Sequence, residues 1–206
     1  THAHASFDVS TRDTDRIVEL ARREGAEAVV SSCSDVALPA LAATVEALDL
    51  PGVRPKTLEL WHPKSNLRRL QADGGLPCPE FVTGPATKEL VLRAAALEGE
   101  VVVKPTDRSG SRGVSCVAAN DATALERAIF EAAEIGFEGE VIVEGFVPGL
   151  EYGGDAWIEG GRVRSIFATA KTMQGAVVRG HTMPSGLPDD DLDALILWEN
   201  GSGPFE

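Results

Sequence analysis

The sequence has 206 residues, of which 32 are Asp or Glu and 19 are Lys or Arg, so its formal net charge is −13. Such an acidic chain repels nucleic-acid phosphates and anionic lipid at long range, which argues against nucleic acid or a membrane surface as a partner. No apolar run reaches the roughly 20 residues that span a bilayer, and residues 1–7 lack the basic and apolar regions of a secretion signal. The three cysteines, Cys33, Cys78 and Cys116, lie far apart without CxxC spacing, which indicates reduced thiols in a cytoplasmic protein.

The first 51 residues predict a helix, a strand and a second helix. Apolar residues at helical spacing predict a helix over residues 10–25, capped by Ser10 or Thr11. A short apolar run over residues 27–31 predicts a buried strand. The apolar face of the second helix carries Leu41, Val45 and Leu48. This order is typical of a parallel α/β layer, but a complete layer would begin with another strand and helix, so residues 1–51 are expected to form only part of such a domain.

The rest of the chain alternates predicted helices and strands. Helices are expected over residues 64–73, 86–97, 121–135 and 189–198, and strands over residues 80–82, 100–104, 114–118 and 140–144. Two further strands, residues 155–159 and 162–168, flank two glycines and are expected to pair as a hairpin. Three aspartates begin the last helix, where their charge suits the positive end of the helix dipole. The mixture indicates the α/β (α+β) fold class.

A lysine and a glycine-rich loop follow the most apolar of these strands. Residues 101–103 are three valines, Lys104 ends the strand, and residues 105–113 are rich in Gly, Ser and Arg. Small residues let a loop fold over an anion and point its N–H groups at it, and Lys104 would add a point charge for the same phosphates. The GxxxxGK[ST] pattern of a Walker loop is absent. A plain hairpin loop beside an unrelated lysine is the alternative interpretation of this segment alone.

Charged residues also mark the ends of two other predicted elements. Glu144 ends an apolar strand and Glu151 begins the next, so two carboxylates flank a connector and are able to accept hydrogen bonds from an adenine amino group and from ribose hydroxyls. Lys64 begins a basic helix ahead of a Gly-Leu-Pro-Cys-Pro sequence at residues 75–79. Taken alone, each segment has a plain alternative: solvated carboxylates near a turn, and a solvated helix face.

In this order, the segments resemble the ATP-grasp superfamily over residues 52–188, most closely its carbamoyl-phosphate-synthetase-like and amino-acid-ligase-like branches. The resemblance implies an ATP-grasp domain over residues 52–206 that follows a partial pre-domain at residues 1–51, with ATP and Mg²⁺ as cofactors. It also implies a ligase that joins a small-molecule carboxylate to an amine, or to a thiol, through an acyl phosphate. The resemblance leaves open whether the protein forms a homodimer. The alternative is a nucleotide-binding module without turnover, or a degenerate remnant of the fold.

The resemblance assigns roles to individual residues. Lys64 and Lys104 contact the α- and β-phosphates from two subdomains. The mobile lid over the phosphates comprises Arg108, Ser109, Gly110, Ser111, Arg112 and Gly113. The adenine site comprises Glu144 and the backbone of Gly145, Phe146 and Val147. Glu151 binds the ribose.

One histidine is the candidate catalytic residue. His181 lies in the Gly-His-Thr-Met-Pro-Ser sequence of residues 180–185, which resembles a family segment whose histidine lies near the phosphates. A structural or surface histidine is the alternative. Lys171 is a second residue that the resemblance allows to face the phosphates.

The resemblance breaks down where the metal ligands should lie. ATP-grasp enzymes hold Mg²⁺ with two acidic residues on late strands, the second usually within Glu-x-Asn, because this ion prefers carboxylate and phosphate oxygens. Here Glu199 and Asn200 are adjacent, and the sequence ends at Glu206, where the first of those strands should begin. The metal ligands are therefore unknown and expected beyond Glu206. The chain is expected to be incomplete at both ends, and these 206 residues alone are not expected to turn over ATP.

Overall fold

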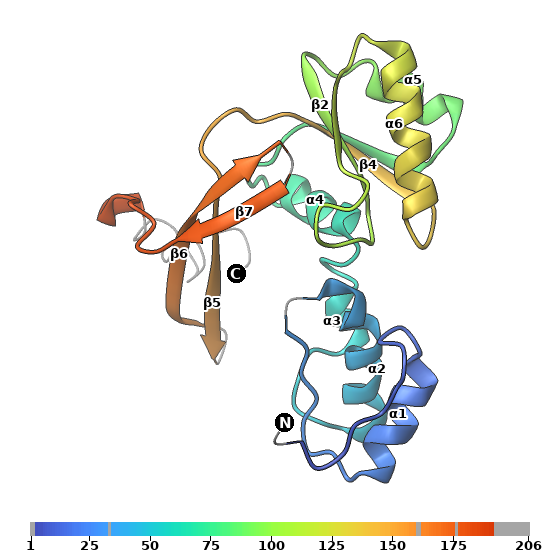
Figure 1. The fold of residues 1–206 in the computed structure, drawn as a ribbon, viewed down its shortest axis with the longest axis vertical. Coiled ribbons are helices and arrows are strands. Elements are labelled where there is room, and N and C mark those ends of the chain that lie inside the picture. Colours follow the sequence, from blue (N-terminus) through green and yellow to red (C-terminus); the bar gives the residue numbers. More distant parts are fainter. Residues whose placement is uncertain (1–2, 33, 160–161, 176, 192–206) are drawn as a thin grey trace.

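A computed structural model describes residues 3–32, 34–159, 162–175 and 177–191 (Figure 1). They form a group of N-terminal helices, a four-stranded sheet with its helices, and a three-stranded sheet. In Figure 1 the N-terminal helices lie below the four-stranded sheet, and the three-stranded sheet stands to one side. The mixture of helices and sheets confirms the predicted fold class.

The N-terminal layer consists of α1 (Thr14–Arg23), the 3₁₀ helix η1 (Asp35–Ala37), α2 (Leu38–Leu48) and α3 (Pro55–Leu58). Asp13 caps α1 in place of the predicted Ser10 or Thr11, because its carboxylate accepts a hydrogen bond from the backbone N–H of Arg16 at 3.2 Å. The polar helix α1 buries Leu20 and packs against α2. Both predicted helices are therefore present.

The strand predicted over residues 27–31 is wrong. These residues are irregular, and Val30 is 90% exposed. A strand needs a neighbouring strand to satisfy its backbone N–H and C=O groups, and none of the described strands pairs with this segment. The assignment of residues 1–51 to a separate domain stays a prediction.

Four strands form an antiparallel sheet in the order β1-β4-β2-β3. They are β1 (Phe81–Pro85), β2 (Glu100–Pro105), β3 (Ser115–Ala118) and β4 (Glu140–Gly145). Helices α5 (Lys88–Ala94) and α6 (Ala122–Ile135) cover one face. The core on that face includes Leu90, Leu125, Ile129, Val101, Val103, Val141 and Val143. Because side chains alternate along a strand, the residues between these valines point to the other face of the sheet.

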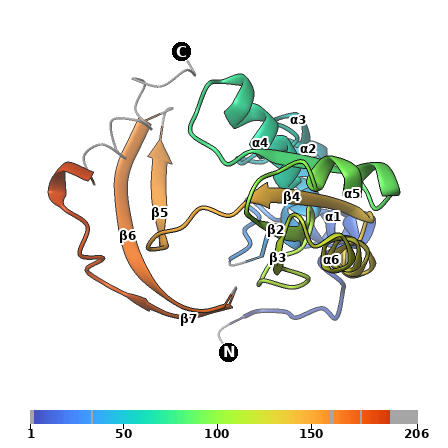
Figure 2. The ribbon, with the colours of Figure 1, turned by 90° about the horizontal axis from the view of Figure 1, so that it is seen from above.

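Helix α4 (Lys64–Asp73) has the predicted bounds and lies near that other face (Figure 1). Residues 146–151 then leave β4 and cross to the second sheet, as Figure 2 shows from above. This crossing is the covalent link between the two sheets. Glu144 and Gly145, at the end of β4, are therefore close in sequence to Tyr152, where the second sheet begins.

The second sheet is antiparallel in the order β5-β6-β7. Its strands are β5 (Tyr152–Glu159), β6 (Arg162–Gln174) and β7 (Val177–Thr182). The predicted hairpin is thus present with longer strands, its two glycines lie outside the described residues, and β7 was not predicted. Of the helix predicted over residues 189–198, residues 189–191 are helical and the rest lies outside the described residues.

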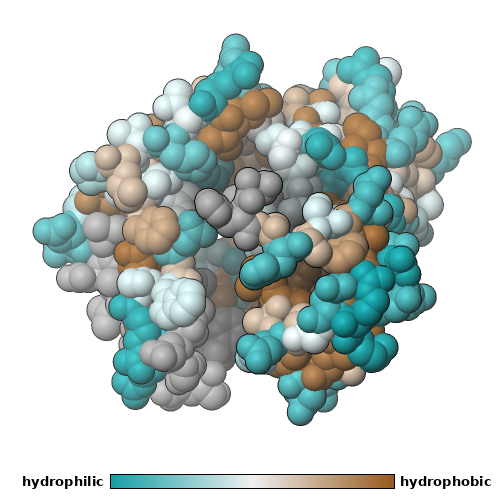
Figure 3. Space-filling view, turned by 60° about the horizontal axis from the view of Figure 1, so that its bottom comes forward, coloured by the Kyte–Doolittle hydropathy of each residue, from teal (hydrophilic) through white to brown (hydrophobic). Residues whose placement is uncertain are grey.

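Hydrophilic residues occupy most of the surface in Figure 3, with hydrophobic residues showing between them. Among the described residues, no helix has both the length and the apolar character that crossing a membrane requires. Cys78 and Cys116 are free thiols, as the sequence predicts, and Cys33 lies outside the described residues.

Candidate functional site

The register of β2 and β4 brings Lys104 and Glu144 together. Lys104 lies opposite Ile142, and Glu144, two residues further along β4, points to the same face of the sheet. Its carboxylate is 6% exposed and accepts a hydrogen bond from the Lys104 ammonium at 2.5 Å. Val103, which precedes Lys104, and Val143, which precedes Glu144, belong to the core under α5 and α6 on the opposite face, so the core fixes the direction in which both charged side chains point.

Arg68 of α4 is a third member of this cluster. Its Nε donates to the second carboxylate oxygen of Glu144 at 2.7 Å, and its Nη1 donates to Gln71 Oε1 at 2.6 Å. No role for Arg68 is predicted from the sequence. The available signal was its spacing of four residues from Lys64, which places both cations on the same face of the helix.

Lys64 extends the cluster toward the glycine-rich loop. Its ammonium donates to the backbone carbonyl of Arg108 and lies 3.9 Å from the carboxylate of Asp35. Its backbone N–H donates to the carbonyl of Thr106 at 3.1 Å. Burial lowers the pKa of Lys64 from its ordinary value; Asp35 opposes this shift and the charge of Lys104 adds to it. Two lysines from separate elements therefore meet at the base of the loop.

The loop of residues 108–113 has an exposed tip and a packed end. Gly110, Ser111 and Gly113 have left-handed backbone conformations, with φ angles of 69°, 56° and 71°. A Cβ atom on Gly113 would lie 3.0 Å from Pro105 Cγ and 3.2 Å from Ile135 Cβ. Glycine at position 113 thus lets the loop return close to the body of the protein, while Gly110 and Arg112 are exposed.

Phe137, which follows α6, holds the first residue of this loop. The guanidinium of Arg108 lies 4.1 Å from the centre of the Phe137 ring, and that of Arg12 lies 3.6 Å from it. Both carboxylate oxygens of Asp107 accept hydrogen bonds from the backbone N–H of Phe137, and one also accepts from that of Glu138 at 2.8 Å. These contacts of Asp107 and Arg108 therefore hold the start of the loop against the segment that follows α6.

The predicted adenine site has fewer open backbone donors than expected. The N–H of Gly145 donates to Glu80 O and that of Phe146 donates to Glu100 O, each at 2.9 Å. Of the three N–H groups at residues 145–147, only that of Val147 lacks a protein acceptor among the described residues, and Val147 is 67% exposed. An incoming base would thus find one free donor. The adenine role of this segment stays a prediction.

The other predicted site residues lie together on the second sheet. The Lys171 ammonium donates to a carboxylate oxygen of Glu151 at 2.7 Å, and His181 Nδ1 lies 2.8 Å from Thr169 Oγ1. Lys171 and His181 are partners in the β6–β7 register. Both line a cavity of about 490 Å³. A Cβ atom on Gly153 would lie 2.7 Å from Lys171 Cε, so glycine at that position leaves room for the lysine.

The predicted residues therefore form two clusters. The first comprises Lys64, Lys104 and Glu144 at the base of the 108–113 loop, and the second comprises Glu151 and His181, which Lys171 joins. The connector of residues 146–151 joins the two (Figure 2). Among the described residues, no group of three or more His, Cys, Asp or Glu side chains is arranged to hold a metal ion, so no described residue is assigned to Mg²⁺.

No family model matches the sequence, and no curated protein gives a significant match. Among solved structures, the biotin carboxylase domain of 2-oxoglutarate carboxylase from Hydrogenobacter thermophilus, solved with MgADP, ADP and bicarbonate, matches with a TM-score of 0.70 and 19% identity over 90% of this chain and 44% of that one. L-amino acid ligase from Bacillus licheniformis matches with a TM-score of 0.63 and 24% identity over 89% of this chain and 43% of that one. Phosphoribosylglycinamide synthetase from Anaerococcus prevotii matches with a TM-score of 0.65 and 16% identity over 95% of this chain and 49% of that one.

The chain has an ATP-grasp fold. This confirms the fold that the order of sequence segments predicts. The chain spans about half the length of these ATP-grasp structures. At such identities the likeness shows the ATP-grasp fold and leaves the roles of single residues as predictions.

Proposed function

We propose that this chain binds ATP and is the nucleotide-binding part of a ligase that activates a carboxylate as an acyl phosphate. The observation that carries the proposal is the meeting of Lys64 and Lys104, from a helix and a strand, at the base of the glycine-rich loop. The ATP-grasp fold supports it, since one matching structure was solved with MgADP. Lys104 and Arg68 share the single carboxylate of Glu144, and Lys64 lies near that of Asp35, so three cations face two carboxylates and one positive charge is available to a phosphate.

In this proposal each cluster serves a different part of the nucleotide. Lys64 and Lys104 bind the phosphates as point charges, and the N–H groups of the 108–113 loop close over them. Glu144 holds Lys104 in place from the buried side. Glu151 binds the ribose, while Lys171 and His181 face the phosphates from the second sheet.

The proposed reaction has two steps. A carboxylate oxygen of the substrate attacks the γ-phosphorus of ATP, the bond from that phosphorus to the β,γ-bridging oxygen breaks, and ADP leaves. An amine then attacks the acyl carbon, phosphate leaves, and the nitrogen gives up a proton. The residues of this chain contribute by binding the phosphates and stabilising the charge that develops on their oxygens.

The free thiols of Cys78 and Cys116 support a cytoplasmic location.

We expect calorimetric titration with Mg-ATP to show binding at one site. Because the 108–113 loop offers no apolar side chain to a core, its amides should exchange quickly without nucleotide and more slowly with it. Hydrogen exchange followed by mass spectrometry measures both states, and the buried residues of α6, which lie outside the proposed site, serve as the internal reference. Absence of heat together with identical exchange in the two states would remove the nucleotide from this proposal.

Glu151→Ala is expected to narrow the preference for ATP over dATP, because it removes the acceptor proposed for the ribose hydroxyls. Glu151 is also the partner of Lys171, so a general loss of affinity would show only that this pair had been broken. The ratio of the two dissociation constants separates these cases. A parent-like ratio in the variant excludes the ribose role. Glu98→Ala, which removes an exposed carboxylate elsewhere, is the matched control.

A further inference from the structure

Two cations share the buried carboxylate of Glu144. One oxygen accepts a hydrogen bond from the Lys104 ammonium at 2.5 Å, and the other accepts one from Arg68 Nε at 2.7 Å. The three side chains together therefore carry one net positive charge. The proposed function assigns Lys104 to the phosphates and Glu144 to its support, and it leaves Arg68 without a task.

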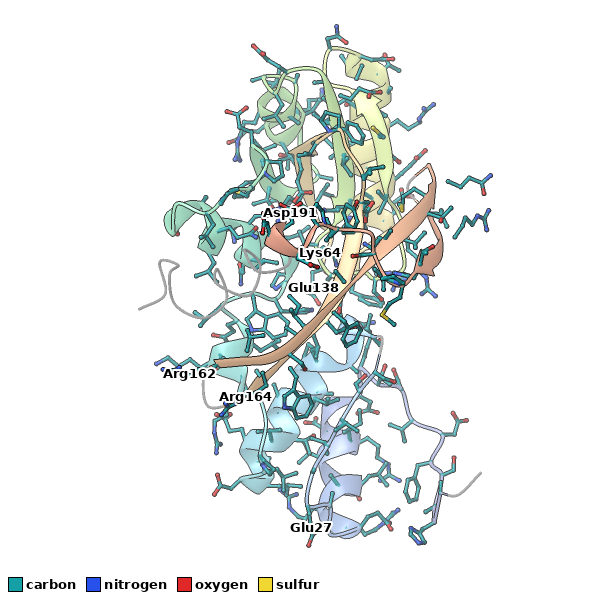
Figure 4. The ribbon with its side chains drawn as sticks, turned by 90° about the vertical axis from the view of Figure 1, so that its left-hand side faces the viewer. Glu27, Lys64, Glu138, Arg162, Arg164 and Asp191 are labelled. Atoms are coloured by element: carbon teal, nitrogen blue, oxygen red, sulfur yellow. The ribbon has the colours of Figure 1, made fainter. Side chains whose placement is uncertain are left out.

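Arg68 lies one helical turn beyond Lys64 on α4. Lys64 begins this helix, and it contacts the start of the glycine-rich loop through its backbone N–H, which donates to Thr106 O, and through its ammonium, which donates to Arg108 O. Figure 4 shows Lys64 between the N-terminal helices and the first sheet. Four residues advance a helix by about 6 Å, so Arg68 is placed at Glu144 and Lys64 at the loop.

The guanidinium of Arg68 is held in position on its own helix. Its Nη1 donates to Gln71 Oε1 at 2.6 Å while its Nε donates to Glu144, and the side chain is 24% exposed. A guanidinium stays charged at any pH at which the protein is folded. Arg68 is therefore a permanent, oriented counter-charge for Glu144.

This counter-charge changes what Lys104 is able to do. A buried carboxylate is costly unless a cation compensates it, and Glu144 is only 6% exposed. If Lys104 were the sole partner of Glu144, its charge would be needed there. Because Arg68 compensates the second oxygen, Glu144 stays paired when Lys104 turns toward an anion. An ammonium has three N–H donors, and among the described residues Glu144 is the only acceptor of this one.

We infer that Arg68 is a positioning residue for the phosphates: it holds the Glu144 carboxylate, and thereby leaves the Lys104 ammonium free to bind an anion, without touching the nucleotide itself. The inference rests on the proposed function, because it concerns the phosphate contact of Lys104. It extends that function to a residue of another element.

The test is calorimetric titration of the 206-residue chain and its variants with Mg-ATP. Arg68→Gln is expected to weaken binding about tenfold, the order of coupling found within one salt-bridge network. Arg69→Gln removes an exposed arginine at the next position, so it controls for the change in net charge and should leave the affinity close to that of the parent. In a Glu144→Gln background, Arg68→Gln should have no more effect than Arg69→Gln, because no carboxylate remains for Arg68 to hold.

Two results would overturn the inference. Parent-like affinity in a folded Arg68→Gln protein would show that Arg68 supports only the fold, since a purely structural role changes stability and not affinity. A tenfold loss in the Glu144→Gln background as well would show that Arg68 acts on the phosphates directly. The variants that lack the Glu144 charge leave no buried carboxylate uncompensated, so their comparison decides the matter even if Arg68→Gln alone does not fold.

The parent protein separates this inference from the proposed function. Absence of Mg-ATP binding by the parent defeats the proposed function, and this inference with it. Binding by the parent that does not depend on Arg68 defeats only this inference. Parent-like circular dichroism of each variant establishes that it is folded.

Discussion

Lys104→Ala is expected to weaken Mg-ATP binding about 10- to 100-fold. A charge-assisted hydrogen bond to phosphate contributes about 1.5–3 kcal/mol, and each tenfold change in affinity corresponds to about 1.4 kcal/mol. Lys104 is 20% exposed at the end of β2 and is fixed by Glu144, so little conformational entropy remains to be lost when a phosphate arrives. Isothermal calorimetry of the parent and the variant measures the change.

Two further variants make the Lys104 result specific. Lys88→Ala removes an exposed lysine from α5 and controls for the change in net charge. Lys104→Arg keeps a cation beside Glu144 but replaces a point charge by a planar fork. Parent-like affinity in a folded Lys104→Ala protein would remove Lys104 from the site, whereas weak binding in both position-104 variants would show that the compact ammonium is required.

Glu144→Ala is expected to lower the free energy of unfolding by about 3 kcal/mol. Removing one partner from a buried ion pair typically costs about 3–5 kcal/mol, because the remaining charge stays uncompensated. Here two cations lose their partner, but Lys104 and Arg68 are 20% and 24% exposed, so water relieves part of the cost and the lower end of that range applies. Urea unfolding at pH 7 measures the difference.

The Glu144 prediction has a direct comparison within the same fold. Glu126→Ala removes an exposed carboxylate from α6 and should change stability by no more than about 0.5 kcal/mol. A loss below about 1 kcal/mol in Glu144→Ala would place this pair among ordinary surface salt bridges. Its carboxylate would then be better explained by the adenine contact alone.

Local sequence patterns predicted most of the elements because each pattern acts within a few residues. The bounds of α4 match, and Asp121 caps α6 by accepting a hydrogen bond from the Ala124 N–H at 3.0 Å. The strand at residues 27–31 failed because an apolar run does not reveal whether a partner strand is available. Strand β7 was missed for the converse reason: pairing with β6 forms it, and its own sequence has no strong alternation.

Contacts within the site depend on elements that are distant in sequence. Lys104 and Glu144 were identified separately as site residues, but their mutual pairing depends on the register of β2 with β4. Arg68 joins them from a helix 76 residues before Glu144. A cavity of about 670 Å³ between the N-terminal helices and the end of β2 was not predicted at all, because its wall is assembled from several segments that carry no common motif.

The stacked ring of Phe137 has a practical consequence for anyone who labels or engineers this protein. One face of the ring carries the guanidinium of Arg12, and the guanidinium of Arg108, the first residue of the loop, also lies against the ring. A fluorophore, affinity tag or fusion partner attached close to Arg12 would disturb the packing of the Phe137 ring, which also holds Arg108 at the start of the loop. Attachment sites should therefore be chosen away from residue 12, and a reporter placed there deliberately would serve as a remote sensor of what happens at residue 108.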